Sequence, residues 1–144
     1  MTTVSQLLQA KGAEVWSVAP DTSVYDALVL MADKNIGALV VLEAGKLKGI
    51  ISERDYARKV VLHGKASRDT PVREIMTAAV VTIRPDQTIQ HCMALMTDKH
   101  IRHLPVIDGE RVAGIVSIGD VVKSIISEQR FLIEQLEGYI TGSR

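Results

Sequence analysis

Two short stretches place a hydroxyl and a carboxylate where an apolar strand is expected to run into a helix. Each stretch, 49–55 and 114–120, contains a Gly, an apolar run and then Ser-x-x-Asp, and the two lie 65 residues apart. The start of a helix has unpaired backbone N–H groups and partial positive charge, so it suits an anion such as phosphate. The same pattern is typical of a capping box, in which Ser and Asp only satisfy the helix end. The candidate ligand-binding residues from these stretches are Ser52, Asp55, Ser117 and Asp120.

These stretches belong to an internal duplication. Segments 20–56 and 85–121 align without a gap and share 13 identical positions out of 37. A repeated unit of roughly 50 residues is too small to bury a stable core alone, so two units are expected to pack around a pseudo-two-fold axis. The sequence therefore predicts an α/β (α+β) fold of two β-α-β-β-α units with a C-terminal helical extension. We assign residues 1–64 to the first repeat with an N-terminal helix, and 65–144 to the second repeat with a connector and the C-terminal helix, together forming one module.

Periodicity and turn residues predict the elements that position the two stretches. A short helix over 5–11 precedes the repeats. The elements expected in the first repeat are a strand over 15–18, a helix from 24 to about 35, strands over 38–42 and 47–52, and a helix over 53–62. Those expected in the second are a helical turn over 72–76, a strand over 80–83, a helix over 88–99, strands over 104–107 and 111–117, and a helix from 118.

Composition excludes several classes of function. Seventeen basic and 17 acidic residues give a formal net charge of zero, which argues against a nucleic-acid or anionic-membrane binder. No apolar run approaches the roughly 20 residues of a membrane span, and the first 12 residues lack the apolar core of a signal peptide. The single Cys92 cannot form an internal disulfide, which favours a cytoplasmic location. The His and Cys spacing fits no metal site.

The C-terminal segment has more apolar residues than its own repeat can cover. Val122, Ile126, Ile133 and Leu136 continue a helical stripe beyond the duplicated unit. A stripe of this kind, left without a partner in its own chain, indicates contact with another subunit. We therefore expect a homodimer.

The duplicated unit resembles a tandem pair of cystathionine β-synthase (CBS) domains. The second copy carries VVTIxPD at 80–86, IRHLPVID at 101–108 and GIVSxxD at 114–120, and the first has matching residues at 18–21, 37–41 and 49–55. The resemblance covers about residues 15–124. It implies a regulatory module that binds adenosine-containing ligands such as AMP, ADP, ATP, NAD or S-adenosylmethionine in two clefts between the repeats. It further implies that Asp accepts the ribose hydroxyls and that Ser and basic residues bind phosphate.

Carried over by motif, the resemblance implies two sets of site residues. The first cleft would contain Ser52, Arg54, Asp55, Val80, Val81, Ile101, Arg102, His103 and Pro105. The second would contain Ser117, Asp120, Val15, Trp16, Ile36, Gly37 and Ala38. Gly37 and Ala38 stand where the other repeat has Arg102 and His103, and Gly119 stands where it has Arg54. We therefore expect the first cleft to prefer phosphorylated nucleotides and the second to accept adenosine-like ligands or a larger dinucleotide.

The function expected from these residues is that of a stand-alone sensor. It would have no obligatory cofactor and no catalysis, and it would signal energy or metabolite state to a protein that the sequence does not identify. One alternative is a structural dimerisation module with degenerate clefts. The other is a nucleotide-processing enzyme that uses Asp55 or Asp120 as a base and His103 as an acid. No nucleophile or catalytic triad in the sequence supports the enzyme alternative.

Overall fold

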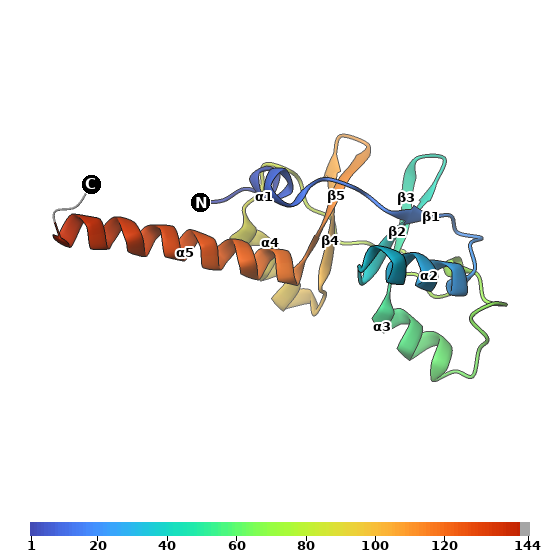
Figure 1. Ribbon diagram of the computed structural model, residues 1–144. Helices are drawn as coiled ribbons and strands as arrows, with labels where there is room; N and C mark the ends of the chain where they lie inside the picture. The colour runs from blue at the N-terminus through green and yellow to red at the C-terminus, as the bar shows by residue number, and fades with distance from the viewer. Residues whose placement is uncertain (142–144) are drawn as a thin grey trace. The chain divides into compact units, whose positions relative to one another are not determined.

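The computed structural model describes residues 1–141 of the protein (Figure 1). Within them, five α-helices accompany a three-stranded sheet, in the order β1-β2-β3, and a two-stranded sheet of β4 and β5. This mixed architecture confirms the predicted α+β class. The chain divides into two compact units that are not continuous in sequence. We call residues 14–81 and 109–113 the N-repeat unit, and residues 1–13, 82–108 and 114 onward the C-repeat unit.

The N-repeat unit is a small sheet covered by helical segments. Strand β2 (Ala38–Glu43) pairs in parallel with β1 (Ser17–Val18) and antiparallel with β3 (Lys46–Ser52). Helix α2 (Val24–Lys34), helix α3 (Glu53–Tyr56), the π-helical turn η1 (Ala57–Val61) and the 3₁₀ turn η2 (Val72–Glu74) complete it. The β2–β3 hairpin turns at Ala44 and Gly45, which both have positive φ, as expected of a type I′ turn.

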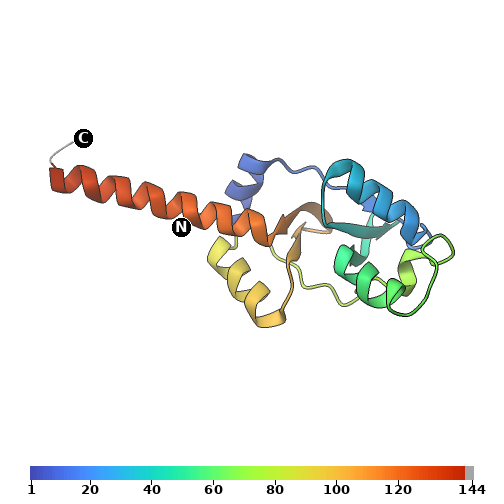
Figure 2. The same cartoon turned by 60° about the horizontal axis from the view of Figure 1, so that its bottom comes forward.

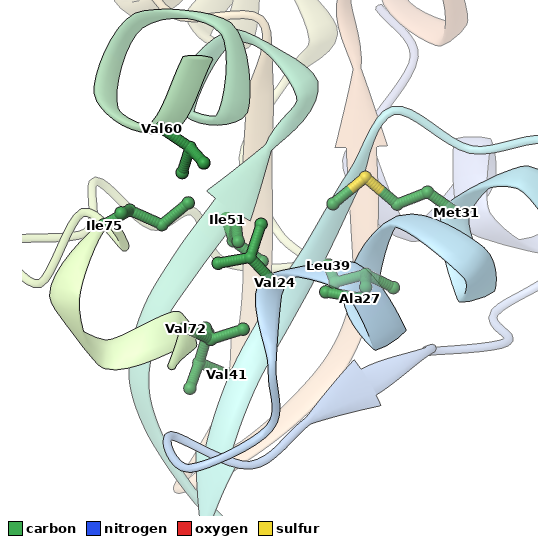
Figure 3. Packing of buried hydrophobic residues seen from close by; sticks show 9 residues of the cluster. All are labelled: Val24, Ala27, Met31, Leu39, Val41, Ile51, Val60, Val72 and Ile75. Atoms are coloured by element: carbon green, nitrogen blue, oxygen red, sulfur yellow. The ribbon is translucent and has the colours of Figure 1, made fainter. Parts of the chain in front are cut away.

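Apolar side chains from the sheet, α2, η1 and η2 form the core of the N-repeat unit (Figure 3). Burying such side chains stabilises the fold by about 25 cal/mol for each Å² of apolar surface removed from water, and it holds β3 in place. The β3 residue Gly49 also approaches the chain closely, since an added Cβ would lie 2.9 Å from the Thr77 carbonyl oxygen. The fully buried members of the core are Val24, Ala27, Met31, Leu39, Val41, Ile51, Val60, Val72 and Ile75.

The C-repeat unit contains α1 (Val4–Lys11), α4 (Ile89–Lys99), β4 (His103–Asp108), β5 (Arg111–Ser117) and α5 (Ile118–Thr141). Helix α1 packs beside the first turns of α5, and α5 then extends beyond the other elements of this unit (Figure 2). The backbone also joins α1 to the start of α4: the Val4 N–H donates to the Gln87 carbonyl at 2.8 Å, and the Ile89 N–H donates to the Thr2 carbonyl at 3.0 Å.

Two predicted strands are wrong in extent or in kind. The strand over 15–18 is reduced to Ser17–Val18, and the strand over 80–83 is only a single parallel bridge between Ile83 and Val106. Both segments lead to a proline two residues further on, Pro20 or Pro85. Proline has no N–H for a ladder hydrogen bond, so it prevents pairing beyond the C-terminal end of each segment. The shortening is at the N-terminal end, where residues 15–16 and 80–82 form no ladder pair.

The predicted helix over 53–62 is also wrong in part. It is α-helical only to Tyr56, and the next turn is wider. The Leu62 N–H donates to the Ala57 carbonyl at 3.3 Å, which is the i to i+5 spacing of a π-helix.

Candidate ligand-binding sites

The first candidate site, the Ser52–Asp55 site, lies where β3 ends and α3 begins. The Asp55 N–H donates to Ser52 Oγ at 3.3 Å, and the Ser52 N–H donates to the Asp55 carboxylate at 2.9 Å. Both bonds of a capping box are therefore present. The capping role weighed from the sequence is correct here. It also fixes the carboxylate in one orientation.

Lys59 completes the Ser52–Asp55 site. Its ammonium lies 3.2 Å from Asp55 Oδ1 and donates to the Ile75 carbonyl at 3.0 Å. The Asp55 side chain is mostly covered, with 13% of its surface exposed. Each oxygen of this carboxylate thus has a partner, one a backbone N–H and the other a cation.

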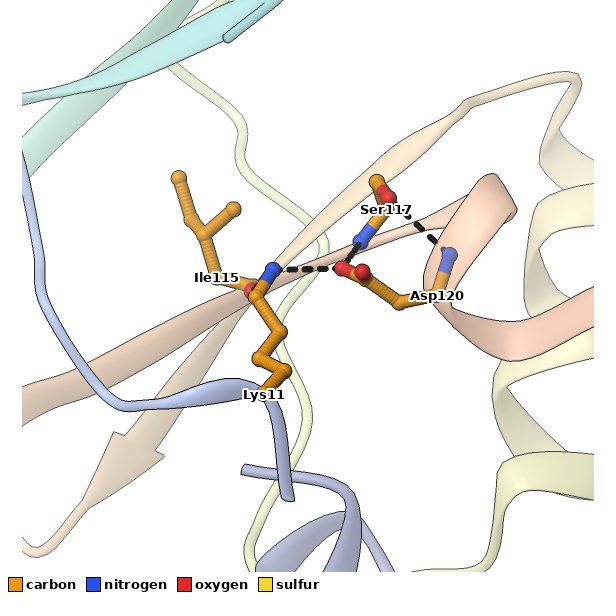
Figure 4. A network of polar contacts seen from close by, with 4 residues as sticks. All are labelled: Lys11, Ile115, Ser117 and Asp120. Atoms are coloured by element: carbon orange, nitrogen blue, oxygen red, sulfur yellow. Dashed lines mark hydrogen bonds and ion pairs between the residues drawn. The ribbon is translucent and has the colours of Figure 1, made fainter. Parts of the chain in front are cut away.

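The Ser117–Asp120 site repeats this arrangement at the junction of β5 and α5 (Figure 4). The Ser117 N–H donates to the Asp120 carboxylate at 2.9 Å, and the Asp120 N–H donates to Ser117 Oγ at 3.1 Å. Asp55 and Asp120 therefore occupy equivalent local positions, as the 65-residue repeat predicts.

The residue after each serine is held in an equivalent way. The Glu53 N–H donates to the Gly37 carbonyl at 3.1 Å, and the Ile118 N–H donates to the Arg102 carbonyl at 2.8 Å. These bonds place residue 37 or 102 beside the Ser-x-x-Asp motif of its own repeat. Gly37 and Arg102, which immediately precede β2 and β4, are thus neighbours of their own repeat's Ser-x-x-Asp motif.

Lys11 occupies the Ser117–Asp120 site from α1. Its ammonium donates to the Asp120 carboxylate and, at 2.9 Å, to the Ile115 carbonyl (Figure 4). Lys11 is the last residue of α1, and the buried Leu8 on the same helix packs on Gly114, where an added Cβ would lie 2.8 Å from Leu8 Cδ2. The glycine of the repeat therefore makes room for the helix that carries the lysine.

The charges around Asp120 influence one another. Burial alone would raise the pKa of Asp120, but hydrogen bonds from Lys11 and Ser117 lower it below its usual value. Burial lowers the pKa of His103, and the positive charges of Lys11 and Arg102 lower it further, against the opposing effect of Asp120. His103 is therefore favoured in its neutral form beside an ion pair.

A groove of about 590 Å³ adjoins the Lys11–Asp120 pair in the C-repeat unit. It lies between α1 and α5, and its wall is apolar at Leu7 and Phe131. The polar lining residues closest in sequence to Asp120 are Lys123, Ser124 and Ser127. We call this cavity the α1–α5 groove.

Sequence reasoning paired neither lysine with its aspartate. Lys11 is 109 residues from Asp120 and lies outside the duplicated segment, so no repeat signal links them. Lys59 follows Asp55 at i+4, a spacing that favours an ion pair on a helix and that could have identified it.

The other predicted site residues lie in both units. Trp16 and Ile36 pack against the core of the N-repeat unit, and the Lys34 ammonium lies 4.2 Å from the Trp16 ring centroid. Val15, Gly37, Val80 and Val81 are half-buried, Ala38 is buried opposite Ser52 in the β2–β3 ladder, and Arg54 is exposed. In the C-repeat unit, Arg102 is exposed, Ile101 and His103 are half-buried, and Pro105 is buried. The expected association of residues from different units in one cleft stays a prediction.

The described residues offer little for metal or thiol chemistry. Among residues 1–141, no three His, Cys, Asp or Glu side chains gather where they could hold a metal ion. Burial raises the pKa of the Cys92 thiol to about 11, so it is protonated at neutral pH. None of the helices in this range combines the length and hydropathy needed to cross a bilayer.

Comparison with known proteins gives a consistent result. The CBS domain family model matches residues 10–62 and 72–127. The mitochondrial CBS domain-containing protein CBSX3 of Arabidopsis thaliana is 42% identical over 98% of this chain and 73% of its own length. A protein with CBS domains from Burkholderia ambifaria has a solved structure that is 51% identical, with a TM-score of 0.86, over 89% of this chain and 96% of that one.

A third similar structure contains ligands. The CBS domain pair of protein MJ0100, solved in complex with 5-methylthioadenosine and S-adenosyl-L-methionine, is 28% identical. Its TM-score is 0.79, over 89% of this chain and 98% of that one. With two matched segments that cover most of the chain and the duplicated Ser-x-x-Asp geometry, this protein belongs to the CBS domain family.

Proposed function

We propose that this protein is a non-catalytic regulatory module that binds an adenosine-containing ligand at the Ser52–Asp55 and Ser117–Asp120 sites. The observation that carries the proposal is the repeated geometry, in which a backbone N–H orients each carboxylate and a lysine ammonium lies beside it. A carboxylate with two acceptor oxygens suits the two hydroxyls of a ribose, and the ammonium suits a phosphate or a carboxylate on the ligand.

The comparison with the MJ0100 domain pair supports the ligand class. That protein binds two adenosine derivatives, and its fold is shared over nearly its whole length. AMP, ADP, ATP, NAD and S-adenosylmethionine are therefore the ligands to compare. The ligand-bound state would then be signalled to a partner protein, as expected of a regulatory module.

Calorimetric titration of the wild-type chain and two variants tests this proposal. Asp55→Ala and Asp120→Ala should each remove one binding event, because each deletes one pair of ribose acceptors. The fold should persist, since Ser52 Oγ and Ser117 Oγ still accept the backbone N–H of residue 55 or 120. A ligand present at about 100 times its Kd should stabilise the wild-type fold by about 2.7 kcal/mol.

Asp86→Ala is the matched control, because Asp86 is an exposed carboxylate paired with Arg84 on a turn. It should leave both binding events unchanged. The ligands should also be recovered chemically intact after long incubation. Absence of binding by every adenosine ligand, or turnover that Asp120→Ala abolishes, would contradict the proposal.

A specific feature of α5 favours self-association in addition. Apolar side chains on its distal half are more than half exposed within the chain. They recur at three- and four-residue spacing, which is typical of a helix that packs against another helix. We propose that a second copy of the chain covers them to form a homodimer. These side chains are Leu132, Ile133, Leu136, Tyr139 and Ile140.

A further inference from the structure

We propose that Lys11 makes the Ser117–Asp120 site selective for adenosine ligands that carry a 5′-phosphate, and that the phosphoryl groups enter the α1–α5 groove. This inference rests on the proposed function and deepens it. It reverses the expectation drawn from Gly37, Ala38 and Gly119, which suggested a site without a phosphate-binding cation.

The first step concerns the partners of Lys11. Its ammonium is bonded to the Asp120 carboxylate and to the Ile115 carbonyl. Ribose hydroxyls that bind Asp120 compete for the same carboxylate and weaken this ion pair. A neutral ligand such as adenosine offers Lys11 no replacement. A phosphate does, with charge-assisted hydrogen bonds that are roughly twice as strong as neutral ones.

The second step concerns the space beside the pair. Lys11 and Asp120 both line the α1–α5 groove, so the carboxylate and the groove form one continuous surface. Its volume of about 590 Å³ is within the range of small-molecule pockets. A ligand anchored on Asp120 can therefore extend along α5 without displacing the core.

The third step concerns the charges that such a ligand meets. Lys123 is exposed on the groove wall, and the hydroxyls of Ser124 and Ser127 can donate to phosphate oxygens. The other acid that lines the groove, Glu128, already accepts the Thr2 N–H at 2.9 Å and the Gln90 side-chain N–H at 3.0 Å. The cations near Asp120 and the hydroxyls beyond them thus favour an anionic group at that end of the groove.

The experiment compares adenosine, AMP and ATP by calorimetric titration in an Asp55→Ala background, which leaves the Ser117–Asp120 site as the one under study. Lys11→Met and Lys123→Met keep most of the apolar length of each side chain while removing its charge. Lys46→Met is the matched control, because Lys46 is an exposed lysine in the β2–β3 hairpin of the other unit.

We expect the background protein to bind AMP about tenfold more tightly than adenosine, a difference of about 1.4 kcal/mol, because only AMP offers Lys11 a charge-assisted hydrogen bond. Lys11→Met should abolish that preference and flatten the salt dependence of AMP binding, while adenosine binds equally well or more tightly. Lys123→Met should weaken ATP binding several-fold and leave adenosine unaffected. Lys46→Met should behave like the background protein.

The inference and the proposed function fail in different ways. An AMP-to-adenosine preference that is the same in Lys11→Met and in the background protein overturns the role of Lys11 but leaves adenosine binding intact. ATP binding unchanged by Lys123→Met overturns the placement of the phosphoryl groups in the groove. A folded background protein that binds none of the three ligands overturns the proposed function of this site.

Discussion

Asp55 and Asp120 have equivalent backbone partners but meet their lysines differently. At Asp55 the backbone bond goes to Oδ2 and the lysine lies against Oδ1. At Asp120 both Ser117 and Lys11 contact Oδ2. A ligand hydroxyl can therefore reach Oδ1 of Asp120 before Lys11 is released. At Asp55 it has to compete with Lys59 from the outset.

The neutral state of His103 leads to a pH-dependent stability. Its pKa in the folded protein is lowered from 6.5, first by burial and then by Lys11 and Arg102, while Asp120 opposes this. The unfolded chain therefore binds a proton more readily than the native state as the pH falls below 6.5. The stability associated with a neutral His103 is fully present above pH 6.5 and declines as the pH drops towards the lower folded value.

His103→Gln should remove this decline, because glutamine does not titrate. Urea denaturation between pH 5 and 7.5 would measure it as a flatter dependence of the unfolding free energy on pH. His63→Gln is the control, since His63 is exposed in the N-repeat unit. The assignment would be wrong if His103→Gln and the wild-type chain lost stability in parallel.

The sequence predicted the local geometry that Ser and Asp share in both repeats, because a gapless repeat preserves it. That these residues bind a ligand stays a prediction. The sequence did not predict Lys11, whose contact with Asp120 depends on how α1 packs rather than on any motif. The backbone bonds of Gly37 and Arg102 to the following helix were not predicted either, since each joins residues 16 positions apart. Local patterns predict hydrogen bonds within a turn, but contacts made by tertiary packing have no such signature.

At the scale of elements, α5 shows how much of a helix can be predicted from the spacing of its apolar residues. Its stripe was predicted from spacing alone, and the structure shows one continuous helix over Ile118–Thr141. The buried Val121 near its start belongs to the fold, whereas Leu132 and Leu136 are exposed. The two short strands could not be predicted in the same way, because pairing requires a partner strand in register and not only apolar residues.

The exposed part of α5 predicts concentration-dependent assembly. Leu132→Lys combined with Leu136→Lys should convert a dimer into a monomer at micromolar concentration, because two charges would be buried in an apolar interface. Light scattering coupled to gel filtration would measure the mass. Glu134→Lys introduces the same group at an exposed position of the same helix between them and should leave the dimer intact. A wild-type chain that is monomeric throughout would refute the interface.

At the scale of the molecule, the duplication and the compact units divide the chain differently. The repeats follow one another in sequence, but α1 lies in the unit that contains the second repeat. Residues 65–81 group with the first repeat instead. The division of the chain at residue 64 stays a prediction about the repeats, and it does not describe how the units are composed.

Equivalent core positions provide a test of these units. Ile89 and Val24 are 65 residues apart, and both are fully buried. Ile89→Ala should cost about 2–5 kcal/mol and loosen α1, which is bonded to the start of α4. Val24→Ala should instead loosen α2. Hydrogen exchange would show α1 amides losing protection in the first variant and keeping it in the second. Equal loss of protection in both would contradict the division.

The placement of α1 in the C-repeat unit has a consequence for synthesis on the ribosome. Helix α1 is synthesised before the segments it packs against, which begin at Thr82. At about 5–20 residues per second, the intervening 14–81 segment takes roughly 3–14 s to be made. Val4, Leu7 and Leu8 have no core to join during that time, while the N-repeat residues are already available to pack together. The nascent chain thus exposes the apolar residues of α1, which a chaperone can bind, until translation reaches α4.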